Sequence, residues 1–144
     1  MSGADDFLLR GRKVAAALAF VAIAFASGWS LIFPKKPIPL SRADGIYANS
    51  QCGAIELHNG VASWGAMKAS YTLDTDKEGM FALTDYFVGV KTEGQACSLA
   101  SDRSKYPLKL RFDDSERPTV VTLWDRDQPA TVNFSRQATW PKGG

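Results

Sequence analysis

Two cysteines and one histidine are the residues of this sequence best suited to nucleophilic or metal chemistry. Zinc sites use closely spaced Cys and His ligands, but Cys52, His58 and Cys97 show neither CxxC nor HxH spacing. Cys52 and His58 could form a nucleophile and its base, but no group that would orient the histidine is evident. The even pair of cysteines instead predicts a disulfide between Cys52 and Cys97, and two separate buried thiols are the alternative.

Other polar motifs give no stronger indication of chemistry. The acidic clusters at 113–117 and 125–127 could hold a cation or act as paired carboxylates, but turn-forming residues surround both, which indicates solvent-exposed loops. The chain has no G-x-S-x-G motif, no S-x-x-K motif and no glycine-rich phosphate loop. The sequence therefore predicts no catalytic residue, no metal site and no cofactor, which argues against an enzyme.

An uncharged run at residues 14–33 predicts a membrane span. As a helix it would be about 30 Å long, which is the thickness of the hydrocarbon core of a bilayer. A secretory signal peptide cleaved after Ala26 is the alternative, but the apolar run continues past that point to Phe33. Cations flank the run on both sides and are predicted to contact lipid headgroups: Arg10, Arg12, Lys13, Lys35 and Lys36.

The short tail before this segment favours a signal-anchor, with the C-terminal part exported. The predicted disulfide agrees with an oxidising compartment, so we expect an inner-membrane, single-pass protein with a periplasmic domain. The predicted span is also rich in small residues, which allow helices to pack closely in lipid. We expect the span to pack against other membrane subunits through five of them: Ala15, Ala19, Ala22, Ala26 and Gly28.

The exported part alternates apolar and polar residues with a period of two, which is typical of half-buried strands. Asn59-Gly60 is a strong hairpin signal within this pattern. About eight strands are expected, with a possible ninth at 130–136: 45–49, 54–58, 61–66, 69–74, 80–87, 95–100, 106–112 and 119–125. Their short connections predict a small antiparallel up-and-down β-barrel, with a two-sheet sandwich as the alternative.

The predicted organisation has five parts: a basic tail (1–13), the transmembrane helix (14–33), a proline-rich linker (34–43), the barrel (44–136) and a C-terminal tail (137–144). Residues 1–36 carry five Lys/Arg and two Asp, a net charge of +3, whereas residues 37–144 carry twelve Lys/Arg and thirteen Asp/Glu, a net charge of −1. A domain without a basic excess is a poor nucleic-acid partner.

Parity assigns side chains to the two faces of the predicted strands. Leu108, Leu110 and Phe112 share the inward face, and Val121 and Leu123 match them in the next strand. That assignment turns Trp124 outward. Trp124 and Trp140 are therefore candidate protein contacts, because exposed tryptophans are enriched at interfaces.

The stretch that begins at Asp44 resembles the start of small lipocalin-like barrels, through the Gly45-Ile46-Tyr47 element. This resemblance implies an apolar or amphiphilic ligand in the lumen. The chain lacks the long first loop and the C-terminal helix of that family, so we expect side chains to fill the lumen. A small-molecule ligand is possible but not indicated.

A second resemblance is to bacterial antiviral effectors that tether a β-barrel nucleotide sensor to membrane helices. Those effectors carry more than one span, whereas one is predicted here. We therefore expect a non-catalytic binding module, an accessory or assembly subunit of a larger membrane complex. A ligand-sensing effector and a tethered periplasmic inhibitor or immunity protein are the alternatives.

Overall fold

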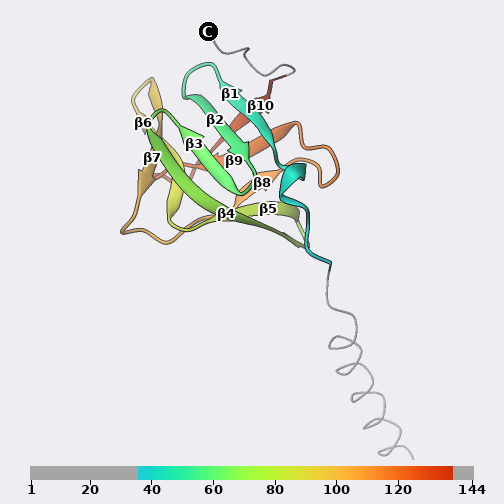
Figure 1. Ribbon diagram of the computed structural model, residues 1–144. Coiled ribbons are helices and arrows are strands. Elements are labelled where there is room, and N and C mark those ends of the chain that lie inside the picture. Colours follow the sequence, from blue (N-terminus) through green and yellow to red (C-terminus); the bar gives the residue numbers. More distant parts are fainter. Residues whose placement is uncertain (1–35, 138–144) are drawn as a thin grey trace, which may run out of the picture. The chain divides into compact units, whose positions relative to one another are not determined.

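The computed structural model describes residues 36–137 (Figure 1). Within them, no helix has the length and apolar character needed to cross a bilayer. The predicted span at 14–33, with its small residues, lies outside the described residues. So do Trp140 and all the predicted headgroup cations except Lys36, which is exposed.

Ten strands make up the described domain. Eight of them form a closed antiparallel barrel, and β6 and β7 form a separate two-stranded sheet. This closed barrel excludes the sandwich alternative. In chain order the elements are the short 3-10 helix η1 (Leu40–Arg42), β1 (Gly45–Asn49), β2 (Gly53–His58), β3 (Val61–Trp64), β4 (Met67–Asp76), β5 (Gly79–Thr84), β6 (Phe87–Glu93), β7 (Ala96–Asp102), β8 (Leu110–Phe112), β9 (Val120–Trp124) and β10 (Thr131–Arg136).

The barrel is an up-and-down meander with one excursion. Its order is β1-β10-β9-β8-β5-β4-β3-β2, so β5 pairs directly with β8 while β6 and β7 leave the wall between them. The first and last strands close the barrel through the pair Tyr47↔Arg136. Asn59 and Gly60 have φ of 46° and 81°, the left-handed backbone that a tight two-residue hairpin requires, which confirms the predicted turn.

The strand predictions were wrong in one region, between residues 85 and 109. The expected strand at 80–87 is two strands, because β5 ends at Thr84 and β6 begins at Phe87. The expected strand at 106–112 starts only at Leu110, since Pro107 has no N–H to give to a ladder. Leu108 is consequently 41% exposed, not inward-facing as parity predicted.

The two ends of the barrel are closed differently. We call the end with the β1–β2, β3–β4 and β9–β10 turns the capped end, because the β6–β7 hairpin lies against it (Figure 1). The opposite end, which the chain enters through residues 37–44, is the linker end. There Leu40 of η1 packs against the core beside Gly60, and the Tyr47 hydroxyl donates to the Ala43 carbonyl at 3.0 Å.

Candidate binding surface

Inward-facing side chains fill the barrel interior. Alternation along the strands sends large apolar residues inward from every wall. Six of them have no accessible surface at all, so no space large enough for water adjoins them: Tyr47, Ile55, Leu57, Val121, Leu123 and Phe134. Val121 and Leu123 are buried as parity predicted. A ligand inside the lumen would have to displace this packed core.

One polar atom within the core has no partner. The Tyr71 hydroxyl is buried and makes no hydrogen bond to any residue from 36 to 137. Burial raises the pKa of Tyr71 to about 12, and burial likewise raises the pKa of Tyr47 to about 12. Both phenols therefore stay neutral at physiological pH.

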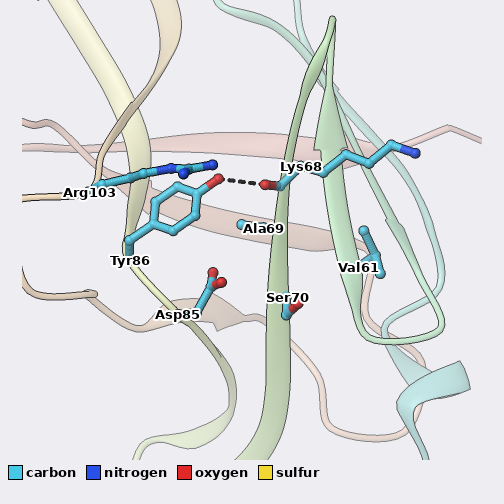
Figure 2. A pocket seen from close by; sticks show the side chains of 7 residues that line it. All are labelled: Val61, Lys68, Ala69, Ser70, Asp85, Tyr86 and Arg103. Atoms are coloured by element: carbon cyan, nitrogen blue, oxygen red, sulfur yellow. Dashed lines mark hydrogen bonds between the residues drawn. The ribbon is translucent and has the colours of Figure 1, made fainter.

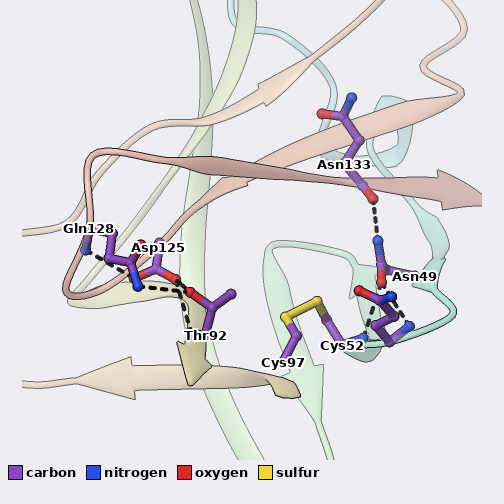
Figure 3. Close-up of a disulfide and its surroundings, with 8 residues drawn as sticks. Asn49, Cys52, Thr92, Cys97, Asp125, Gln128 and Asn133 are labelled. Carbon is purple, nitrogen blue, oxygen red and sulfur yellow. Dashed lines mark hydrogen bonds between the residues drawn. A yellow bond between two sulfur atoms is a disulfide. The ribbon is translucent and has the colours of Figure 1, made fainter. Parts of the chain in front are cut away.

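A disulfide joins the β6–β7 hairpin to the barrel, as the sequence predicted (Figure 3). Cys97 on β7 bonds to Cys52 in the β1–β2 turn, with Cα atoms 4.6 Å apart. Asn49 shapes that turn, since its Oδ1 accepts hydrogen bonds from the backbone N–H groups of Gln51 and Cys52. Its amide nitrogen also donates to the Asn133 carbonyl at 3.0 Å, which ties the turn to β10.

Asp125 holds the other side of the hairpin (Figure 3). Its Oδ2 accepts from the Thr92 N–H at 3.0 Å and from the Thr92 hydroxyl at 2.6 Å, while Oδ1 accepts from the N–H groups of Asp127 and Gln128. Burial opposes its ionisation, but these hydrogen bonds outweigh burial and lower the pKa of Asp125. The prediction of a solvent-exposed loop at 125–127 was thus wrong for Asp125, which is 4% exposed.

A close backbone approach completes the capped end. A Cβ atom at Gly89 would overlap the carbonyl oxygen of Trp124 and the ring of Phe87. Only glycine lets β6 pass this near to the end of β9. The Arg126 N–H then donates to the Val90 carbonyl at 2.7 Å, which extends the contact past the strand.

A surface hollow of about 500 Å³ lies beside β4 as an open groove (Figure 2). We call it the β4 groove and define it by its lining residues: Val61, Lys68, Ala69, Ser70, Asp85, Tyr86 and Arg103. Lys68, Ser70, Asp85 and Arg103 are all exposed, so the hollow is open rather than enclosed. Its size is within the usual range of ligand sites, but an open shape suits a chain better than a small molecule.

Tyr86 forms the floor of the β4 groove and is held rigidly. The Tyr86 hydroxyl donates to the Lys68 carbonyl at 2.5 Å. The buried Thr84 hydroxyl donates to the Tyr86 carbonyl at 2.6 Å. The guanidinium of Arg103 lies over the Tyr86 ring, 5.3 Å from its centroid, within cation–π range. Sequence reasoning missed this groove because it forms where the chain leaves the barrel wall after β5.

A second cluster of charges, at the linker end, is neutralised internally. Asp76 accepts a two-pronged hydrogen bond from Arg111 at 2.7 and 2.8 Å, and Lys109 donates to it at 2.6 Å. The bonds from Arg111 and then Lys109 hold the pKa of Asp76 well below its usual range. Lys109 also lies 4.2 Å from the centroid of the Phe81 ring. The cluster supports the short β5–β8 pairing, and we interpret it as structural.

The other predicted residues lie apart from the β4 groove. Trp124 is 38% exposed at the end of β9, facing outward, and its role as a protein contact stays a prediction. His58 is exposed, and its Nδ1 lies 3.3 Å from the Oδ2 of Asp44. Within 113–117, Asp114 accepts hydrogen bonds from the N–H groups of Glu116 and Arg117, which shapes an exposed loop.

Within residues 36–137, no group of three or more His, Cys, Asp or Glu side chains could hold a metal ion. Compared with protein-family models, curated protein sequences and solved structures, the chain gives no match. The lipocalin-like resemblance therefore extends only to the architecture, an eight-stranded antiparallel barrel.

Proposed function

We propose that this protein is a non-catalytic binding module, anchored by one N-terminal helix in the inner membrane, with its barrel in the periplasm. In this role it is an accessory or assembly subunit of a larger membrane protein complex. The observation that carries the proposal is the contrast between the filled interior and the open β4 groove on the outer wall. A packed barrel offers its surface, not its lumen, to a partner.

The filled interior is also why we favour a protein partner over a ligand-sensing effector. The six residues with no accessible surface, all on β1, β2, β9 and β10, leave a lumen ligand no space beside them. A groove on the outside of a rigid barrel instead suits recognition of another protein's surface, because little conformational entropy is lost when a preformed site binds.

The disulfide supports the periplasmic location, since such bonds persist in oxidising compartments. Thiol alkylation in intact cells tests this placement. Cys52 and Cys97 should resist labelling, even after unfolding, until a reductant is added. Free labelling of the unfolded protein without reductant would place the barrel in the cytoplasm and contradict the proposal.

The helix contributes through its small residues in this proposal. At about 100° per residue, Ala19 and Ala22 would share one face of the proposed helix with Ala15 and Ala26. Ala17 and Ala24 would lie on the opposite face, toward Gly28, so the comparison tests the alanine face alone. Bulky side chains on a packing face should separate the helices. The test compares Ala19→Ile/Ala22→Ile with the matched control Ala17→Ile/Ala24→Ile in membranes solubilised in a mild detergent.

The readout is the mass of the native complex that contains this chain. We expect the first pair to shift the chain from the large complex to a smaller species, and the control pair to leave the complex intact. If both pairs leave the mass unchanged, the helix is only a tether and the assembly role loses its support.

A further inference from the structure

One wall of the β4 groove is a strand edge. β4 pairs with β3 from Met67 to Ser70, but with β5 only from Tyr71 to Asp76. The Asp85 N–H donates to the Ser70 carbonyl at 3.0 Å, and beyond this bond the chain leaves the wall to form β6. Among the described residues, 67–69 thus have a partner strand on one side only.

The open side of this edge presents a backbone donor, the Lys68 N–H. Backbone groups alternate in direction along a strand, so Lys68 points toward the same side as Ser70. Its carbonyl accepts the Tyr86 hydroxyl, and its N–H faces the β4 groove. An unpaired strand edge is a template for an added extended segment.

The groove continues along the outer face of β4. A second hollow of about 270 Å³ shares Ser70 and Asp85 with it and reaches Thr72 and Leu83. Lys68, Ser70 and Thr72 alternate outward along β4, so the combined groove runs about 13 Å along the strand. That length matches four or five extended residues of a ligand.

Three charged residues along the groove have no ion-pair partner within residues 36–137: Lys68, Arg103 and Asp85. Arg103 nevertheless lies over the Tyr86 ring. In Figure 2, Arg103 and the Lys68 backbone lie at the same level of β4, but the Lys68 side chain extends to the other side of the strand from Arg103. Asp85 and Ser70 lie further along the hollow. At the far end, Leu83 is 37% exposed and offers an apolar contact.

From this arrangement we infer that the β4 groove binds an extended segment of a partner protein, four or five residues long, laid along β4. The segment carries an acidic side chain at the Lys68/Arg103 end and an apolar side chain at the Leu83 end. Asp85, which lies between these two ends, accepts a hydrogen bond from a donor group of the segment. This inference rests on the proposed function, because it names the chemistry of the partner that the binding module recognises.

The test is selection from a phage-displayed library of random seven-residue peptides on the full-length chain in detergent. We expect the recovered peptides to share an Asp or Glu, with an apolar residue two or four positions away on the same face of an extended chain. Lys68→Glu/Arg103→Glu should lower recovery of these peptides by about tenfold or more.

The matched control is Lys77→Glu/Arg117→Glu, which changes the net charge equally at two exposed residues outside the groove. It should leave recovery unchanged. A non-reducing gel and the thermal midpoint of each variant show that the barrel is intact. Peptides without an acidic bias, equal recovery on both variants, or no enrichment over empty detergent micelles would each overturn the inference.

The outcome separates this inference from the proposed function. If the selection fails while Ala19→Ile/Ala22→Ile still reduces the mass of the native complex, the accessory role stands and the groove assignment falls. If acidic peptides are recovered but the helix substitutions have no effect, the groove assignment stands and the helix is only a tether.

Discussion

The capped end and the linker end close the same barrel by different means. At the capped end, a covalent bond and a buried carboxylate join residues that are far apart in sequence: Cys52 with Cys97, and Thr92 with Asp125. At the linker end, the entering chain packs its own Leu40 and Ala43 against the first strands. One end is held by bonds between segments that are distant in sequence, and the other is covered by the segment that precedes β1.

This difference matters because force and chemistry reach the two ends separately. In the proposed membrane-anchored form, a tether would pull on residues 37–44. Redox conditions act where the disulfide is, at the capped end. The disulfide therefore lies at the opposite end of the barrel from residues 37–44.

The largest expected effect comes from the disulfide. Cys52→Ser/Cys97→Ser should lower the free energy of unfolding by roughly 4 kcal/mol, because the bond closes a loop of 45 residues in the unfolded chain. Urea unfolding of the full chain in detergent measures the loss. Amide exchange should accelerate first in β6 and β7. An equal acceleration of amide exchange at the linker end would contradict the assignment of the disulfide's effect to the capped end.

Disturbing the close backbone approach at Gly89, at the capped end, should lower the free energy of unfolding less than loss of the disulfide. Gly89→Ala places a methyl group against the Trp124 carbonyl, and such overpacking destabilises proteins by about 1–3 kcal/mol. The same urea titration detects it. Ser98→Ala, on the exposed face of the same hairpin, is the control and should change stability by no more than about 0.5 kcal/mol. A Gly89→Ala protein as stable as this control would contradict a tight docking of the hairpin.

At the linker end the two buried tyrosines should respond in opposite ways. Tyr47→Phe removes the hydrogen bond to Ala43 and should cost about 1 kcal/mol. Tyr71→Phe removes a buried hydroxyl without a partner in the described chain, so it should be neutral or stabilising. Thermal unfolding compares the two. An equal loss in both variants would mean that the Tyr71 hydroxyl makes an interaction outside residues 36–137.

Ionisation of these tyrosines should not change the stability of the protein near neutral pH and should change it only at alkaline pH. Their pKa values are raised from 10.0 to about 12 in the folded chain, so the folded state keeps its phenol protons longer than the unfolded state does. Stability is therefore fully present below pH 10 and falls as the pH rises toward 12. Stability curves of wild type and Tyr71→Phe should diverge over this range, and parallel curves would contradict the shift.

Much of the barrel could be predicted from local patterns. Alternation placed Val121 and Leu123 inside and Trp124 outside, and Asn59-Gly60 marked its turn. The paired cysteines predicted the disulfide without any knowledge of the fold. These predictions are confirmed because each feature is encoded within a few residues, or in a residue type with one dominant use.

The features that sequence reasoning missed depend on distant partners. β6 has four consecutive buried residues from Phe87 to Val90, so it shows no alternation to reveal a strand. Asp125 resembles an exposed turn residue until Thr92, 33 positions earlier, is folded against it. The β4 groove likewise depends on the place where the chain leaves the barrel wall after β5. The assignments for the predicted span and for Trp140 lie outside the described residues and stay predictions.

The pairing of β1 with β10 also determines when this domain can finish folding. Tyr47 and Arg136 are 89 positions apart, so closing the barrel brings together nearly the two ends of the domain's sequence. Contacts between residues so far apart in sequence form slowly. If the domain is exported as proposed, both cysteines would reach the oxidising side before β10 has emerged. Until β10 pairs with it, β1 presents an exposed edge, so the last strand of the barrel protects the first.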